Sequence, residues 1–228
     1  MDIDSVVIEV TRRCNMECSH CLRGDAQKQD IKNEYIETLF QKVDTIFSLT
    51  VSGGEPSLVP QKIIDIVTLA KKYNVQIGNF YVATNAKKVT NKFLFALISL
   101  YSYCYENEYS LVSWSNDIYH EEMEEEQIKK LRALSFASAR NSDDQKNYYL
   151  INQGRAKGIG QRHLGKEYFE IDGDFIVEGT IYLNCNGDII AGCDYSYEEQ
   201  EENAICNVKD FSIETVSLYQ LNDAYVNA

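Results

Sequence analysis

Strand-like and helix-like segments alternate along the first two thirds of the chain, and this alternation limits the folds open to it most strongly. β-Branched apolar runs typical of buried strands are each followed by a segment whose apolar residues have helical spacing. The expected strands are Ser5–Thr11, Thr45–Val51, Val75–Thr84, Tyr109–Ser115 and Tyr148–Asn152, and the expected helices are Asn33–Val43, the segment after Pro60, Asn91–Leu100 and Glu121–Phe136. This order predicts an α/β fold with a parallel sheet and helical crossovers, either open or curled into a barrel.

The pattern changes near residue 169. From Ile171 onward the chain has short strand-like runs, and Asn186-Gly187 lies between the apolar runs Ile181–Cys185 and Ile189–Ala191. An Asn-Gly pair in this setting is a strong signal for a β-hairpin. We therefore expect two units, a core over residues 1–168 and a small β appendage with a C-terminal tail over residues 169–228.

The charge of the chain limits its partners. The 228 residues include 22 Lys and Arg against 35 Asp and Glu, so the net charge is −13. This excess repels polyanions and argues against nucleic acid. The apolar stretches are far shorter than the about 20 residues that cross a membrane, and the acidic start of the chain is unlike a signal peptide. We expect a cytoplasmic protein that binds neither nucleic acid nor a membrane.

Seven cysteines in a chain without an export signal indicate metal binding or chemistry rather than disulfides. Cys14, Cys18 and Cys21 form a C-x3-C-x2-C pattern in the polar loop after the first expected strand. Three thiolates on a [4Fe-4S] cluster leave one iron open to another ligand. The alternative is zinc, but a closed zinc site needs four ligands, and His20 beside Cys21 is poorly placed to complete it.

Two motifs together resemble a known family. The run from Thr11 to Gly24 resembles the cluster loop of radical S-adenosylmethionine (SAM) enzymes, and Gly53-Gly54-Glu55-Pro56 resembles their segment for the SAM amino group. The resemblance covers residues 5 to about 160. It implies a partial (β/α)6 barrel of the TIM type, a [4Fe-4S] cluster on the three cysteines, and S-adenosyl-L-methionine on the open iron. The implied reaction cleaves SAM reductively to a 5′-deoxyadenosyl radical, which removes a hydrogen atom from a substrate.

The resemblance also assigns SAM-binding roles near the two motifs. Glu55 would accept a hydrogen bond from the SAM ammonium, and Gly53 and Gly54 would let the backbone approach the ligand closely. The alternative for the glycines is a plain turn from strand to helix. His20 would lie against the adenine, with a place as a solvent-facing loop histidine as its alternative.

Three further residues receive SAM-binding roles from later segments. Ser115 and Asn116, at the end of the fourth expected strand, would reach the ribose hydroxyls, and Arg155 would lie near the SAM carboxylate. Helix capping is an equal alternative for Ser115 and Asn116. A solvated loop is the alternative for Arg155.

Cys185, Cys193 and Cys206 lie in the expected appendage, whose hairpin resembles the SPASM or twitch extension of some radical SAM enzymes. Those extensions hold auxiliary iron–sulfur clusters, but the cysteine expected upstream of the hairpin is absent here. Cys185 also alternates with Ile181 and Leu183 on an apolar strand face, as a core residue would. We expect a twitch-like hairpin without a cluster, and an auxiliary cluster is the alternative.

The leading hypothesis is a radical SAM enzyme that modifies a peptide or small protein, helped by an external electron donor such as flavodoxin or ferredoxin. SPASM-like tails are frequent among peptide-modifying members, and the acidic charge suits a neutral or basic substrate. Because the first strand begins by residue 5, we expect no leader-binding domain before it, so a peptide would be held by the barrel mouth, the appendage or a separate protein. The alternative substrate is a small molecule such as a nucleotide, sugar or cofactor precursor. A non-catalytic metal-binding scaffold is the remote alternative.

Overall fold

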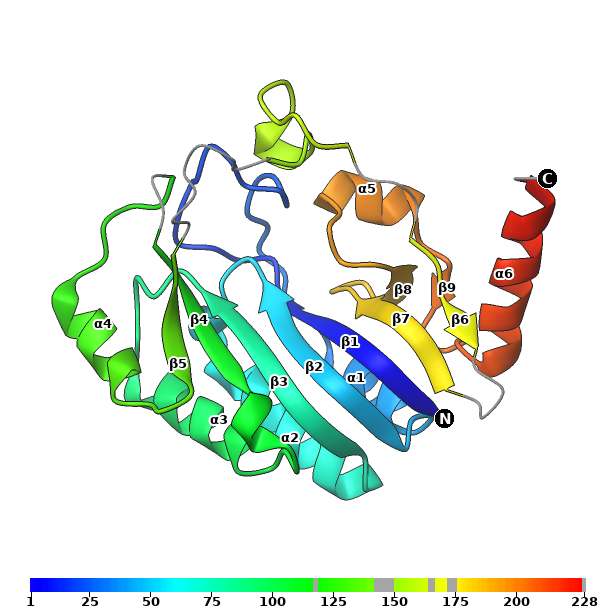
Figure 1. The fold of residues 1–228 in the computed structure, drawn as a ribbon, viewed down its shortest axis with the longest axis horizontal. Coiled ribbons are helices and arrows are strands. Elements are labelled where there is room, and N and C mark those ends of the chain that lie inside the picture. The colour runs from blue at the N-terminus through cyan, green and yellow to red at the C-terminus, as the bar shows by residue number, and fades with distance from the viewer. Residues whose placement is uncertain (117–118, 142–149, 164–166, 172–175, 227–228) are drawn as a thin grey trace.

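The strands form one sheet that is mostly parallel. The computed structural model describes residues 1–116, 119–141, 150–163, 167–171 and 176–226. Within these residues the sheet has the order β5-β4-β3-β2-β1-β7-β8-β9, with β6 paired to β7 (Figure 1). The strands are β1 (Asp2–Thr11), β2 (Thr45–Gly53), β3 (Gln76–Thr84), β4 (Leu111–Asn116), β5 (Ala137–Asn141), β6 (Glu170–Ile171), β7 (Ile176–Leu183), β8 (Asp188–Ala191) and β9 (Cys206–Asn207).

Strands β1 to β5 are parallel neighbours, and helices cover one face of their sheet (Figure 1). The helices are α1 (Asn33–Phe40), α2 (Pro60–Tyr73), α3 (Asn91–Tyr101), α4 (Glu125–Arg132), α5 (Tyr197–Glu202) and α6 (Ile213–Val226). The apolar faces of α1, α2 and α3 are buried against the strands in one core. The expected α/β class is therefore confirmed.

Successive residues of β1 face opposite sides of the sheet, as the pleat requires. Val6, Ile8 and Val10 belong to the core that α1 to α3 cover, whereas Val7 packs in a second, smaller cluster with Tyr182. That cluster is built from the C-terminal third of the chain. Both faces of the first strand are thus buried, which explains the continuous apolar run Val6–Ile8 in its middle.

The fifth strand does not lie where the sequence predicts it. It is β5, directly after α4, and it pairs in parallel with β4. Of the expected segment Tyr148–Asn152, residues 148 and 149 lie outside the described residues, and Ile151 forms an isolated bridge with Arg162. Ala137–Asn141 contains small and polar residues without a β-branched run, so its strand conformation comes from pairing with β4 rather than from local preference.

The expected hairpin is present, and it continues the core sheet. β7 and β8 are antiparallel around Asn186-Gly187, and Gly187 has the positive φ of 85° that favours glycine. β7 pairs in parallel with β1, so the sixth parallel strand lies beside the first strand and not beside β5. The boundary expected near residue 169 therefore falls within one continuous sheet.

Two C-terminal helices have no counterpart in the sequence analysis. α5 reads YEEQEE, which lacks an apolar stripe, yet the side chains of Tyr197 and Gln200 are buried. The Ser196 hydroxyl caps it by accepting a hydrogen bond from the Glu199 amide at 3.2 Å.

Across the described part of the chain, helices that combine the length and apolar character needed to cross a bilayer are absent.

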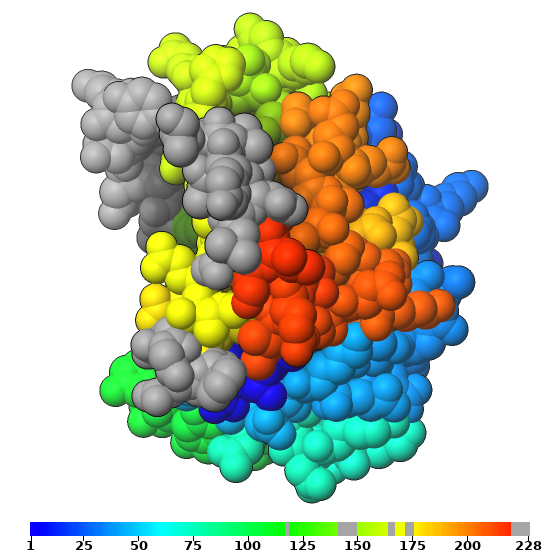
Figure 2. Space-filling view, turned by 90° about the vertical axis from the view of Figure 1, so that its right-hand side faces the viewer, coloured from blue at the N-terminus to red at the C-terminus, as the bar shows by residue number. Residues whose placement is uncertain are grey.

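A lysine connects the first helix to the C-terminal segment, by which we mean residues 176–226, from β7 to α6. Lys42, in the turn after α1, donates hydrogen bonds to the carbonyls of Val208, Lys209 and Phe211 at 3.0, 2.6 and 2.9 Å. These carbonyls follow β9. Figure 2 shows the C-terminal segment, in orange and red, lying beside the blue N-terminal part on this side of the molecule.

We predict that Lys42→Met weakens this attachment. Hydrogen bonds to a charged group each contribute about 1.5–3 kcal/mol, so we expect the free energy of unfolding in urea to fall by at least about 1.5 kcal/mol. Lys92→Met, at an exposed position of α3, is the control and should change stability by no more than about 0.5 kcal/mol. Equal stability of the two variants would contradict the assigned role of Lys42.

Candidate functional site

A cavity of about 370 Å³ opens at the carboxyl ends of the parallel strands. Loops at these ends carry the chemistry in barrel folds of this kind. Most of the residues selected from the sequence line it, namely Cys14, Cys18, His20, Cys21, Gly53, Gly54, Glu55 and Ser115. The structure thus brings the cysteine loop, the end of β2 and the end of β4 together around one space.

Two thiols of the cysteine loop, those of Cys14 and Cys18, have raised pKa values. Burial, followed by the neighbouring Cys21 and Cys14 thiols, raises the pKa of Cys18 to about 11. Burial likewise raises the pKa of Cys14. Thiolates are the metal-binding form of cysteine, so binding here depends on a cation that offsets their mutual repulsion. A site with this chemistry suits a thiolate-bound metal ion or iron–sulfur cluster.

The three thiols of the cysteine loop line one cavity. Within the described ranges, sets of three or more Cys, His, Asp or Glu side chains arranged around one metal ion are absent. A tetrahedral zinc site needs four such ligands at about 2.0–2.3 Å from one ion. A [4Fe-4S] cluster instead takes each cysteine on a separate iron. That Cys14, Cys18 and Cys21 hold a cluster stays a prediction.

The two glycines hold the end of β2 against the start of the cysteine loop. The Gly54 amide donates to the Thr11 carbonyl at 2.7 Å, and the Glu55 amide donates to the Arg13 carbonyl at 2.8 Å. A Cβ on Gly53 would lie 2.2 Å from the Thr11 carbonyl oxygen, and one on Gly54 would lie 2.3 Å from the Arg13 carbonyl oxygen. The close approach seen here is between two parts of the backbone. An approach to SAM stays a prediction.

Glu55 is buried and anchored on both carboxylate oxygens. Oε1 accepts hydrogen bonds from the Thr84 hydroxyl at 2.6 Å and the Ser57 amide at 2.9 Å, and Oε2 accepts one from the Asn85 amide at 2.7 Å. A carboxylate has about four lone-pair sites, so one is left for a further donor. Glu55 therefore joins the ends of β2 and β3 and still faces the cavity.

Asn85 is a site residue that the sequence analysis misses. It follows β3 directly, lines the cavity, and its Nδ2 donates to Asn15 Oδ1 at 2.9 Å and lies 3.8 Å from Cys14 Sγ. Its position at the carboxyl end of a parallel strand is the signal that could have found it. Arg140 and Asp194 also line the cavity. Asp194 comes from the C-terminal segment, and no local pattern marks it.

Aromatic rings form part of the cavity wall. The ring of His20 lies 4.7 Å from that of Tyr119 and 4.8 Å from that of His120, measured between centroids. His20 and His120 both line the cavity, and Tyr119 follows β4. A planar ligand group could pack against this wall. Contact of His20 with adenine stays a prediction.

Asn116 and Arg155 lie outside this cavity. Asn116 lines a neighbouring cavity of about 300 Å³, which shares Ser115 and His120 with the first. Arg155 donates from Nε to Asp25 at 2.9 Å and from a terminal guanidinium nitrogen to the Cys18 carbonyl at 3.1 Å. It thus supports the cysteine loop from the side. A role of Arg155 at the SAM carboxylate stays a prediction.

The appendage cysteines have separate surroundings. Cys185 is buried, and its thiol donates to the Glu9 carbonyl at 3.2 Å. Burial raises the pKa of Cys193 to about 12 and that of Cys206 to about 11. Cys185 therefore has a structural contact of its own, as its place in the apolar alternation predicts. That Cys185, Cys193 and Cys206 hold no auxiliary cluster stays a prediction, which the number of irons per chain tests.

The cysteine loop, the Gly-Gly-Glu turn and the parallel sheet define a radical SAM-type fold, and comparisons with solved structures confirm that resemblance. The structure of native anSMEcpe with bound AdoMet and the Cp18Cys peptide matches with a TM-score of 0.60 and 12% identity, over 94% of this chain and 80% of that chain. The same protein with the Kp18Cys peptide matches with a TM-score of 0.57 and 12% identity, over 95% and 80%.

The comparisons by sequence are more limited. No family model matches the chain. A protein of Methanocaldococcus jannaschii, named as a candidate glycyl-radical enzyme activating enzyme, is 31% identical over 61 residues, which is 26% of this chain and 25% of that protein. The match thus spans about a quarter of the length of this curated relative.

We predict that Glu55→Gln destabilises the protein as well as weakening SAM binding. Glutamine replaces one carboxylate oxygen by an NH2 group, which cannot accept a hydrogen bond. At least one of the three buried groups that donate to Glu55 would then lose its acceptor. This costs about 1–3 kcal/mol of unfolding free energy, measured in urea. Glu126→Gln, which loses only an exposed ion pair with Lys130, is the control and should stay near wild type. A fully stable Glu55→Gln variant would show that these hydrogen bonds are unimportant.

Proposed function

We propose that this chain is a radical SAM enzyme that modifies a peptide. The observation that carries the proposal is the meeting of Cys14, Cys18 and Cys21 with the Gly-Gly-Glu turn around one cavity, at the carboxyl ends of a parallel sheet of the radical SAM type. Fold alone does not decide function, so the site residues bear the argument.

Each group of cavity residues has a separate role in binding the cluster, binding SAM or excluding water. The three thiolates would hold a [4Fe-4S] cluster, whose chemistry, with an electron from an external donor such as flavodoxin or ferredoxin, would be the cleavage of SAM to methionine and a 5′-deoxyadenosyl radical. Glu55 offers its remaining lone pair to the SAM ammonium, and Ser115 offers a hydroxyl to the ribose. His20 and its ring neighbours shield the reacting groups from water.

Three comparisons support a polypeptide substrate. Both anSMEcpe structures contain a bound peptide, and the name of the M. jannaschii protein describes the activation of another enzyme. The net charge of −13 favours a neutral or basic substrate over a phosphorylated one. A small-molecule substrate is the competing possibility, for which Arg140 at the cavity is the most suitable anchor.

We predict that the anaerobically reconstituted protein holds about four irons per chain and releases 5′-deoxyadenosine from SAM in the presence of dithionite. Cys18→Ala removes a cluster ligand, so the release should be lost. Cys104→Ala, in the core and outside the cysteine loop, is the control and should keep both iron and activity. Undiminished release by Cys18→Ala would refute the proposed function, and about eight irons in the wild type would establish an auxiliary cluster.

We further predict that peptides accelerate the release of 5′-deoxyadenosine. Two sets of synthetic peptides, one rich in lysine and one neutral, are compared with a set of nucleotides and sugars at equal concentration. The lysine-rich set should accelerate most, because it complements the acidic protein. Transfer of deuterium from a labelled peptide to 5′-deoxyadenosine then confirms hydrogen abstraction. Acceleration by nucleotides or sugars alone would favour the small-molecule alternative.

A further inference from the structure

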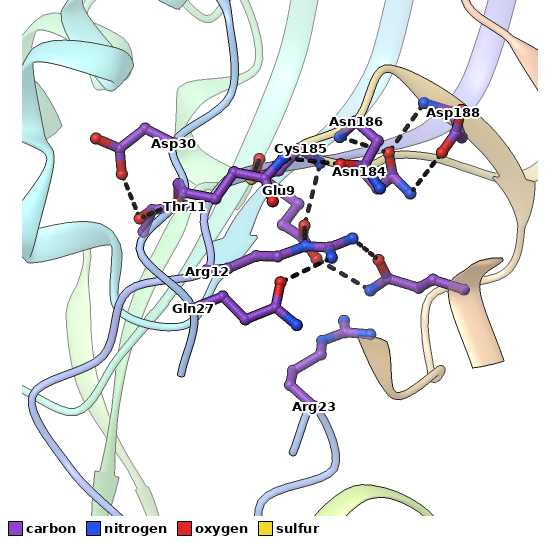
Figure 3. Close-up of polar contacts among 12 residues, drawn as sticks. Glu9, Thr11, Arg12, Arg23, Gln27, Asp30, Asn184, Cys185, Asn186 and Asp188 are labelled. Carbon is purple, nitrogen blue, oxygen red and sulfur yellow. Dashed lines mark hydrogen bonds and ion pairs between the residues drawn. The ribbon is translucent and has the colours of Figure 1, made fainter. Parts of the chain in front are cut away.

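A buried ion pair lies where β1 enters the cysteine loop. Glu9 is fully buried, Arg12 is 1% exposed, and Arg12 Nε donates to Glu9 Oε1 at 2.7 Å (Figure 3). Burial raises the pKa of Glu9, but the charges of Arg12 and Arg23, with the hydrogen bonds from Arg12 and Tyr182, together outweigh it, so the net pKa is lowered and the carboxylate stays charged. Because a buried pair is costly to desolvate, it needs further hydrogen bonds to its remaining atoms.

The C-terminal segment supplies most of those further hydrogen bonds. The Tyr182 hydroxyl and Gln200 Nε2 donate to Glu9 Oε2 at 2.7 and 3.0 Å, and the Cys185 amide donates to Oε1 at 3.1 Å. Arg12 donates in turn to Gln200 Oε1 at 2.8 Å. The entry to the cysteine loop is therefore fastened to β7, to the hairpin turn and to α5.

Arg23 fastens the exit of the same loop to the same segment. Its guanidinium donates to the carbonyls of Tyr195 and Cys193, the latter at 2.7 Å, and lies 4.9 Å from the ring centroid of Tyr182. The Tyr197 amide donates back to the Arg23 carbonyl at 3.1 Å. Figure 3 shows Arg23 below the Glu9–Arg12 pair, pointing toward the C-terminal segment.

The charges of Glu9, Arg12 and Arg23 together leave a net positive charge beside the cysteine loop. Glu9 forms its ion pair with Arg12, and its charge also acts on Arg23, whose direct partners among the described residues are backbone carbonyls and an aromatic ring. Carbonyl dipoles satisfy the guanidinium without cancelling its charge. This charge lies two residues from Cys21, on the side of the loop that faces the C-terminal segment.

We propose that Arg12 and Arg23 are positioning residues that hold both ends of the cysteine loop on the C-terminal segment, and that the positive charge of Arg23 favours the reduced state of the cluster. The effect on the cluster rests on the proposed function, whereas the positioning of the loop concerns the chain alone. In this role the C-terminal segment supports the loop by ionic and hydrogen bonds, whether or not it carries a cluster of its own.

Electrostatics gives the direction of the redox effect. Reduction adds one negative charge to a cluster that three thiolates already make anionic. A nearby positive charge in a poorly hydrated setting stabilises the more negative state, and net charge is one of the factors that set cluster potentials. Removing the charge of Arg23 should therefore lower the reduction potential.

Arg23→Met tests both halves, because it keeps an unbranched apolar stem and removes the charge and the donors of the guanidinium. In the iron-free protein, hydrogen exchange at the amides of Cys21 and Gly24, which donate within the loop, should become about ten- to a hundredfold faster. In the loaded protein, EPR-monitored titration should show a reduction equilibrium about tenfold less favourable, equal to about 59 mV for one electron.

Two further variants separate position from charge. Arg23→Lys keeps the charge but not the two-pronged geometry, so it should restore the potential and only part of the protection. Arg13→Met is the matched control, because Arg13 belongs to the same loop but pairs with Asp30 at the surface, and it should change neither measurement.

Each result bears on a separate claim. Unchanged exchange in Arg23→Met would overturn the positional half, and an unchanged potential would overturn the electrostatic half. If Arg23→Met does not fold, Gln200→Met, which cuts the link to Arg12 without removing a charge, is measured in the same way, with the same exchange effect expected and wild-type exchange overturning the tether. A wild type that binds no cluster would refute the proposed function, while the exchange measurement would still test the tether.

Discussion

A carboxylate that is buried on the central strand of a sheet must be surrounded by donors, and Glu9 is in that position. It receives hydrogen bonds from Arg12, Tyr182, Gln200 and the Cys185 amide, residues that are up to 191 positions away in the chain. Removing one partner of such a buried pair costs about 3–5 kcal/mol, a large part of the stability of an ordinary domain. The fold therefore depends on the C-terminal segment being in place, and so does the shape of the cysteine loop that begins at Arg12.

In the candidate site, as around Glu9, hydrogen bonds of buried polar groups join segments that are distant in the sequence. Glu55 links the ends of β2 and β3, the two glycines let β2 approach the loop, and Arg155 supports the loop through the Cys18 carbonyl. Residues expected to bind SAM thus also hold the cavity in shape. A substitution at Glu55 changes ligand binding and local structure together, and only measurements of both can separate them.

Much of the core could be predicted because its signals are local. The first four strands and their helices follow apolar periodicity, and the cysteine and Gly-Gly-Glu motifs mark strand ends. β5 and α5 lack such periodicity and take their structure from neighbours, β4 in one case and the buried Tyr197 and Gln200 in the other. The partners of Glu9 and the placement of Asp194 were out of reach for a similar reason, since pairing between the first strand and the last third of the chain leaves no local pattern.

The pairing of β7 with β1 has a consequence for how the protein is made. The first strand leaves the ribosome long before its neighbour on one side, which ends at Leu183, so that edge stays open until β7 has been synthesised. Contacts of such large sequence separation form late and slowly. During this interval the cysteine loop has one anchored side at most. Assembly of an iron–sulfur cluster on it would accordingly follow the pairing of β7, and the cell would need to keep the three thiols reduced and the exposed strand edge unpaired until then.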